Sequence, residues 1–423
     1  MTQNPLRLSQ IRHALEGLEP GLGSLEAASQ LRKTLDAEQT RRVVELHQLR
    51  QRAGAKLEDG QALWLSRKGL EQATGRHVAH WRAQRIARWA KSLPEEPWIL
   101  DGTAGIGGDS MALQRAGLGR LLANELDPET ALFLRSNLLR AAGPARVICS
   151  RIETPAIAAQ ALLLDPDRRS PEAGPQGASG PRSGSPQQWS PHWTACLALM
   201  RRFPNTCIKL APAVELSRLE LPAGIPRAWQ WISLGGELKE ATLWTGPWAS
   251  ASDPAPGFQL GTGEQERNVT VLARDGSLRA HWCATPEPCA PLAAEEARSV
   301  GWIAEPDPSV IRAGLVGALA LQQGLAPLAR DCVYLGGAGP AQSGLMQSYE
   351  VLDHCALDKK KLKSMLAAHD VGALVVKKRG HAASAEELSK RFAGRGSKRG
   401  LLVVARLGEA HHAYLVRQAN LTK

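Results

Sequence analysis

Two acidic residues bracket a glycine-rich stretch in the first half of the chain. Asp101 ends the apolar run WILD, and Asp109 follows the last glycine, directly before residues spaced as an amphipathic helix. Glycines let the backbone turn sharply and approach a ligand closely, and the first turn of a helix presents unpaired N–H groups. We therefore expect this stretch, DGTAGIGGD, to bind a small ligand.

Spacing separates three ligand classes that use such a loop. A P-loop needs a lysine after GxxxxG, but Gly107 is followed by Gly108 and Asp109. A dinucleotide fingerprint that begins at Gly105 needs a glycine at position 110, where the chain has Ser110. The flanking carboxylates repel phosphate and suit a cationic or zwitterionic ligand. S-adenosylmethionine, with its ammonium and sulfonium, fits this requirement.

A further acid ends the next apolar run, in the sequence ANELDP. Glu125 lies 24 residues after Asp101, where a carboxylate can accept the hydrogen bonds of two ribose hydroxyls. Two plainer interpretations stay open. Glu125 can be a solvent-facing acid at a strand end, and Asp109 can be a helix-capping residue.

The fourth apolar run, ALLLD, leads into the candidate substrate loop Asp165-Pro166-Asp167-Arg168-Arg169. After Pro166 the loop has neither a second proline nor an aromatic residue that could stack on a base. Our hypothesis is that Asp165 orients or deprotonates the acceptor, while Arg168 or Arg169 neutralises a phosphate or carboxylate. The alternative is a loop cap and ion pairs with nearby acids. The predicted catalytic set is Asp165, Pro166 and Arg168.

Lys209 ends the fifth apolar run and can reach the same edge of a sheet, although such a lysine is often simply solvated. The seven cysteines include no CxxC pair, and no histidine pattern indicates a metal site. We expect thiols in a reducing cytoplasm and no metal. The N-terminus lacks the apolar stretch of a signal peptide. The longest apolar segment, residues 310–328, is interrupted by polar residues, which predicts a buried helix and no membrane span.

The elements that position these residues follow from apolar periodicity. Helical spacing extends over the first ninety or so residues, and short apolar runs then alternate with helices, which indicates a parallel sheet covered on both faces. Residues 229–244 predict a hairpin that turns at two glycines. The Pro/Gly/Ser-rich residues 170–191 predict a mobile loop. Residues 251–300 are irregular with β segments, and residues 346–418 predict a compact α+β unit.

Net charge divides unevenly along the chain. The chain has a net charge of +11. Residues 1–99 have 16 basic and 11 acidic residues, residues 100–340 have 21 and 23, and residues 341–423 have 15 and 7. The basic ends suit a polyanion such as RNA, although Lys and Arg also solubilise helices. Few aromatics accompany the C-terminal cations, which favours contact with a nucleic-acid backbone over base stacking.

At these residues the chain resembles class I S-adenosylmethionine-dependent methyltransferases, in particular a bacterial subgroup with a C-terminal THUMP-like domain. Besides DGTAGIGGD and ANELDPE, the resemblance rests on WLSRKGLEQAT, WRAQRIA, LLLDPDRR, KLAP, SLGGELKEATLW and EPDPSVIRAGL. It implies a Rossmann-like core that binds the cofactor, and action on RNA. Such enzymes often place an Asp after the third strand to contact adenine, whereas this chain has Ser150.

The sequence therefore predicts an α/β protein with a class I methyltransferase core, a helical N-terminal region and a small α+β C-terminal domain. The expected domains are 1–95, 96–300 and 301–423. The expected function is methylation of an RNA nucleobase, in rRNA or tRNA, by a cytoplasmic enzyme; a non-catalytic RNA-binding protein and a small-molecule methyltransferase are the alternatives. The predicted cofactor-binding residues are Asp101, Thr103, Gly105, Gly107, Asp109, Glu125 and Ser150. The predicted RNA-binding residues are Lys359, Lys361, Lys377, Lys378, Arg379, Arg395 and Lys398.

Overall fold

The chain folds into two compact units in the computed structural model, which describes residues 8–18, 22–141, 143–144, 146–153, 157–168, 185–250, 260–261, 263 and 265–419. Unit 1 comprises residues 1–210, 214–225 and 244–253, and unit 2 comprises residues 211–213, 226–243 and 254–423. The boundaries expected at residues 95 and 300 are not the boundaries of these units, so the three-part division stays a proposal. Among the described residues, none of the helices has the length and hydropathy of a membrane-spanning segment.

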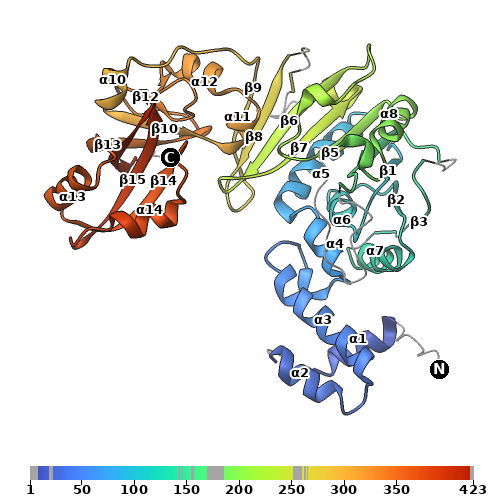
Figure 1. Ribbon diagram of the computed structural model, residues 1–423. Coiled ribbons are helices and arrows are strands. Elements are labelled where there is room, and N and C mark those ends of the chain that lie inside the picture. The colour runs from blue at the N-terminus through green and yellow to red at the C-terminus, as the bar shows by residue number, and fades with distance from the viewer. Residues whose placement is uncertain are drawn as a thin grey trace. The chain divides into compact units, whose positions relative to one another are not determined.

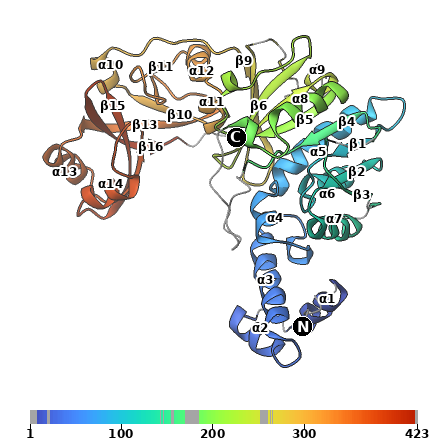
Figure 2. The same cartoon turned by 45° about the vertical axis from the view of Figure 1, so that its right-hand side comes forward.

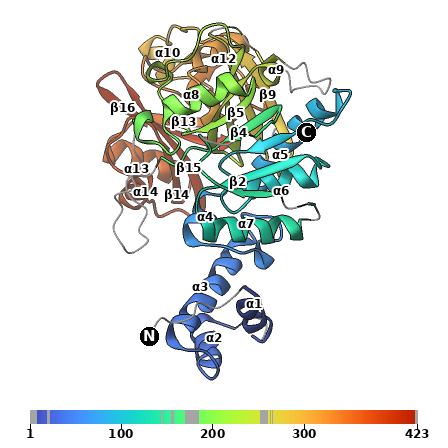
Figure 3. The ribbon, with the colours of Figure 1, turned by 90° about the vertical axis from the view of Figure 1, so that its right-hand side faces the viewer.

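Unit 1 begins with the helices α1 (Leu8–Glu16), α2 (Ser24–Leu31), α3 (Ala37–Ala53), α4 (Arg67–Gln72) and α5 (Arg76–Lys91). The carboxylate of Asp36 caps α3 by accepting the N–H of Gln39, and apolar residues at helical spacing bury one face of α3. The same apolar cluster includes Ile106 in the glycine loop and Leu134 in α7. Figure 3 shows α1, α2 and α3 as a group below α4 and α7. The helices that precede the sheet are therefore packed against the elements around the glycine loop.

Five parallel strands form the centre of unit 1: β1 (Ile99–Asp101), β2 (Leu121–Glu125), β3 (Val147–Cys149), β4 (Ala161–Leu164) and β5 (Asn205–Leu210). Their order is β3-β2-β1-β4-β5, so the chain reverses direction across the sheet between β1 and β4. The intervening helices are α6 (Gly108–Arg115), α7 (Pro128–Arg140) and α8 (Trp193–Arg202). Figure 1 shows α6 and α7 beside β2. The predicted α/β class with a Rossmann-like core is confirmed.

The predicted mobile loop divides at residue 185. Arg169 and residues 170–184 lie outside the described residues, and residues 185–191 lie within them. Ser190 and Asp167 exchange two backbone hydrogen bonds of 2.8 Å, and Trp189 is buried against Trp193 with their ring centroids 6.0 Å apart. The mobility predicted for residues 170–191 stays a prediction; within this stretch, Trp189 buries a large apolar area.

Unit 2 contains β6 (Arg227–Leu234), most of β7 (Glu237–Thr245), β8 (Arg267–Leu272) and β9 (Leu278–Ala284). The predicted hairpin turns at Gly235 and Gly236, whose φ angles of 60° and 85° favour glycine. β6 lies between β7 and β8, pairs in parallel with β8, and β9 runs antiparallel to β8. Of the segment 251–300, residues 251–259 lie outside the described residues, and α10 (Ala294–Arg298) follows β9. The short α9 (Pro247–Ser250) belongs to unit 1.

A second sheet of seven strands, in the order β11-β12-β10-β13-β16-β15-β14, completes unit 2. Its strands are β10 (Trp302–Pro306), β11 (Ala326–Pro327), β12 (Leu335–Gly337), β13 (Met346–Ala356), β14 (Val371–Lys378), β15 (Lys398–Leu407) and β16 (Ala410–Gln418). Figure 2 shows α13 (Lys359–Ala368) and α14 (Ala385–Phe392) side by side next to this sheet, and both helices share one apolar cluster with it. Residues 346–418 thus alternate strands and helices in the predicted order.

The apolar segment 310–328 is not one helix. It contains the end of α11 (Pro308–Arg312) and then α12 (Val316–Gln323), because Gly314 between them has a φ angle of 71° that ends a right-handed helix. Residues such as Val310, Leu315 and Leu319 are buried, as the pattern predicted.

Candidate active site

The glycine loop follows β1 and leads into α6. Gly105 and Gly107 have φ angles of 57° and 97°, a region that side chains rarely allow. The N–H of Gly105 donates to Oε2 of Glu125 at 2.9 Å, so the end of β2 holds the loop. A Cβ placed on Gly105 would meet no atom within 4 Å, whereas one on Gly107 would contact Leu134. Gly105 therefore leaves open space at the carboxyl end of β1 and Gly107 allows close packing.

Asp101 is buried at the end of β1. Its side chain is 4% exposed, and its Oδ2 accepts the hydroxyl of Ser110 at 2.6 Å. Burial, together with the negative charge of Asp109, raises the pKa of Asp101 from 3.8 to about 7. A cation brought next to Asp101 would favour its ionised form, so this carboxylate suits a positively charged ligand.

Asp109 already has its cations. Arg82, which is 1% exposed, forms a close ion pair with Oδ1, and Oδ2 accepts from Thr74 at 2.8 Å and from Lys209 at 3.2 Å. Burial by itself would raise the pKa of Asp109, but the charges of Arg82 and Lys209 and the Thr74 hydrogen bond hold it well below its usual range. The carboxylate does not cap α6, which begins after Gly107. Asp109 therefore organises this edge of the sheet and has little charge left for a ligand.

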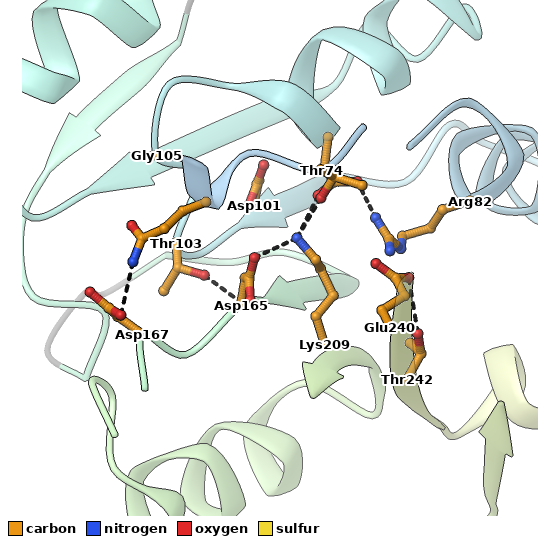
Figure 4. Close-up of polar contacts among 12 residues, drawn as sticks. Thr74, Arg82, Asp101, Thr103, Gly105, Asp165, Asp167, Lys209, Glu240 and Thr242 are labelled. Atoms are coloured by element: carbon orange, nitrogen blue, oxygen red, sulfur yellow. Dashed lines mark hydrogen bonds and ion pairs between the residues drawn. The ribbon is translucent and has the colours of Figure 1, made fainter. Parts of the chain in front are cut away.

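Asp165 lies at the end of β4 beside the glycine loop. Its N–H donates to Oγ1 of Thr103 at 2.6 Å, and its carboxylate, with the side chain 37% exposed, forms a close ion pair with Lys209. Figure 4 shows Thr103, Asp165 and Lys209 facing one another. The two predicted sets, for cofactor and for chemistry, thus meet at one edge, as the carboxyl ends of parallel strands should.

Side chains of α4 hold the rest of the described substrate loop in place. Asp167 accepts from Gln72 and pairs with Lys68, both at 2.9 Å, and its backbone pairs with Ser190. Pro166 and Arg168 lie on either side of Asp167. This anchoring holds the described part of the loop in one position after β4.

Ser150 and Glu125 have structural partners of their own. The hydroxyl of Ser150 donates to Oδ1 of Asn124 at 2.8 Å, and Nδ2 of Asn124 donates to the carbonyl oxygens of Gly102 and Ser150 at 3.0 Å. Glu125 Oε1 accepts the N–H of Asp127 at 2.9 Å. Both carboxylate oxygens of Glu125 retain lone pairs for a ligand.

The predicted RNA-binding residues fall into two groups in unit 2. Lys359, Lys361 and Arg395 are exposed. The ammonium of Lys377 is 2.6 Å from Glu305, and that of Lys378 donates to the carbonyl oxygen of His381 at 2.7 Å. Weaker pairs, of 3.8 and 4.0 Å, join Arg379 to Glu305 and Lys398 to Asp370. Lys377 and Arg379 therefore have a structural partner that the sequence did not indicate.

Sequence reasoning missed Thr74 and Arg82 as site residues. A signal for Arg82 exists, since it shares the buried face of α5 with Val78, Ile86 and Trp81. An arginine on an apolar face requires a carboxylate partner, because an unpaired buried charge is very costly. No comparable signal marks Thr74, which lies between α4 and α5.

The donor set fits S-adenosylmethionine. Asp101 is a buried carboxylate that a cation would ionise, Glu125 has free lone pairs for hydroxyls, and Gly105 adjoins open space. Within the described ranges, no three His, Cys, Asp or Glu side chains come together as metal ligands would, and no cysteine forms a disulfide.

The chain resembles known proteins both over most of its length and in its C-terminal residues 346–418. The THUMP domain-like family matches residues 346–418. Two sequences of Mycobacterium tuberculosis, from strains CDC 1551 and H37Rv, are named uncharacterized S-adenosylmethionine-dependent methyltransferases. Each is 29% identical over 377 residues, which are 86% of this chain and 92% of the relative.

A crystal structure of a protein described as a methyltransferase, from Porphyromonas gingivalis W83, superposes with a TM-score of 0.67 at 15% identity and covers 99% of this chain and 100% of that one. This likeness concerns the fold. Together with the sequence relatives and the matched C-terminal domain, it identifies the chain as a class I methyltransferase with a THUMP-like domain at residues 346–418.

Proposed function

We propose that this enzyme methylates a nucleobase of ribosomal or transfer RNA, and that its basic C-terminal domain docks the RNA. S-adenosylmethionine is the cofactor of the methyltransferase. When bound, it supplies a methyl group on a positively charged sulfur, which leaves as a neutral thioether.

The cofactor site in this proposal consists of the residues at the ends of β1 and β2. Asp101 faces the positive charge of the ligand, Glu125 accepts from the ribose hydroxyls, and Gly105 and Gly107 let the loop backbone approach. Thr103 connects this loop to the substrate side through the N–H of Asp165. Because the leaving group departs neutral, positioning of the two reactants accounts for most of the rate.

The exposed lysines of α13 support RNA as the substrate. Lys359 and Lys361 lie in the first turn, where the positive end of the helix dipole disfavours cations, and Asp358 already caps the helix. These lysines do not stabilise α13, so they are suited to an external polyanion. The charge excess of residues 341–423 and the match to a THUMP domain-like family support the same interpretation.

Loss of a specific modified nucleoside tests this function. A strain without the gene is compared with the same strain complemented by the wild-type protein or by an Asp101→Asn variant. Mass spectrometry of nucleosides from rRNA and tRNA should show one methylated nucleoside that disappears on deletion and returns only with the wild-type protein. Identical nucleoside profiles in all strains would contradict an RNA substrate.

A further inference from the structure

The acceptor side of the site contains a buried cation. Lys209 is the second-last residue of β5, and its side chain is 11% exposed. The ammonium donates to Oγ1 of Thr74 at 2.5 Å and pairs closely with Oδ2 of Asp165 (Figure 4). It also donates to Oδ2 of Asp109 at 3.2 Å. Asp165 is the most exposed of these partners, so a ligand can reach this network from the side of Asp165.

This arrangement is poorly suited to an exocyclic amine. An amine acceptor presents two N–H donors, and its site needs hydrogen-bond acceptors and no competing donor. Here one oxygen of the carboxylate that would receive those hydrogens, Oδ2 of Asp165, is already bound by Lys209, which has only donors to offer. The described part of the loop, residues 165–168, also has no aromatic side chain to stack on a flipped base.

Lys209 can turn one donor toward a ligand at low cost. Its bond to Asp109 is longer than those to Thr74 and Asp165, and Asp109 keeps Arg82 and Thr74 if that bond is released. No buried carboxylate would be left without a partner. A group that develops negative charge next to Asp165 would be stabilised by the ammonium, as a preorganised donor does in a site with little water.

We propose that the methyl acceptor is the imide N–H of a nucleobase, which reacts as an anion, and that Lys209 is the residue that selects it. This rests on the proposed RNA methyltransferase function. The imide N–H bond of the acceptor breaks and its proton passes to Asp165 and then to water. The resulting anion forms the new bond to the methyl carbon, while the carbon–sulfur bond breaks and its electron pair stays on sulfur.

The identity of the product tests the acceptor class. Purified protein is incubated with isotopically labelled S-adenosylmethionine and with RNA from a deletion strain, and the labelled nucleosides are identified by mass spectrometry. Label on an imide nitrogen supports the proposal. Label on an exocyclic amine or on a carbon overturns it and leaves the nucleobase methyltransferase function intact, whereas label on a ribose oxygen or unlabelled RNA contradicts that function as well.

Substitution of Lys209 tests the residue itself. Lys209→Met should lower kcat about 10²-fold or more, while S-adenosylmethionine still binds, and Lys209→Arg should retain part of the rate. Lys91→Met removes an exposed lysine from the end of α5 and should leave kcat unchanged. The Met variant should recover at high pH, where the acceptor ionises without help. A loss that is equal at every pH, or a loss of cofactor affinity as large as the loss of rate, would assign Lys209 a structural role instead.

Discussion

The ionisation of Asp101 gives the strongest quantitative prediction. Its pKa is raised from 3.8 to about 7 by burial and by Asp109. Each pKa unit corresponds to about 1.4 kcal/mol, so the full shift corresponds to about 4 kcal/mol. Because the folded state binds this proton more tightly than the unfolded state, the favourable contribution is complete below pH 3.8 and is lost as pH rises through about 7.

Replacement of Asp101 by Asn removes this dependence. Asparagine has the same shape and can accept the hydroxyl of Ser110, but it has no charge to bury. The variant should therefore unfold at a temperature close to that of the wild type near pH 4 and increasingly above it as pH rises to 8. The difference should approach on the order of 10 °C if the whole 4 kcal/mol applies to unit 1.

Thermal unfolding of both proteins across this pH range measures the difference. Asp127→Asn is the matched control, because Asp127 is an exposed helix cap whose role asparagine can also fill. A pH-independent difference between Asp101→Asn and the wild type would refute the assignment of a costly buried charge to Asp101.

Protonation of Asp101 should also control cofactor affinity. As pH rises, affinity should increase while the contribution of Asp101 to stability decreases. If the ligand cation requires ionised Asp101, affinity falls as pH drops below about 7, up to tenfold per pH unit, and binding releases a proton. Titration calorimetry in two buffers of different ionisation enthalpy detects that release. Equal affinity at pH 6 and pH 8 with no proton released would show that Asp101 does not face the cation.

Further predictions concern the loop, its support and the RNA-docking lysines. Gly105→Val should weaken S-adenosylmethionine binding, measured by calorimetry, because a side chain enters the open space at a positive φ angle. Asn137→Ala should lower the free energy of unfolding by about 2–4 kcal/mol in denaturant titrations, because the buried amide bonds the backbone of Trp64 and Ile106. Lys359→Met should reduce the salt dependence of RNA binding by about one charge without altering the melting temperature, whereas Lys377→Met should lower the melting temperature.

Much of the fold follows from local pattern. The runs that end at Asp101, Glu125 and Asp165 are buried strands, and their order along the chain places these carboxylates at one edge because parallel strands share their carboxyl ends. Glycines at 235 and 236 likewise predict a hairpin, since a tight turn there needs positive φ angles.

The partners of those carboxylates do not follow from local pattern. Asp109 is neutralised by Arg82 and Lys209, which lie 27 residues before it and 100 residues after it. The sequence argument treated Asp109 as free charge that attracts a cation, and tertiary pairing removes that charge. Lys377 is a similar case, because its pair with Glu305 spans 72 residues. Ion pairs between residues so far apart depend on the order of the strands in the sheet and on where each strand ends. Composition and periodicity do not predict either.

Transfer of a labelled methyl group to RNA tests the central claim most directly. Purified protein is mixed with labelled S-adenosylmethionine and total RNA from cells that lack the gene, and the incorporated label is counted before and after nuclease treatment. The account predicts nuclease-sensitive label with the wild-type protein and none with Asp101→Asn. Label that appears only in small molecules, or RNA that stays unlabelled while S-adenosylmethionine binds, would contradict it.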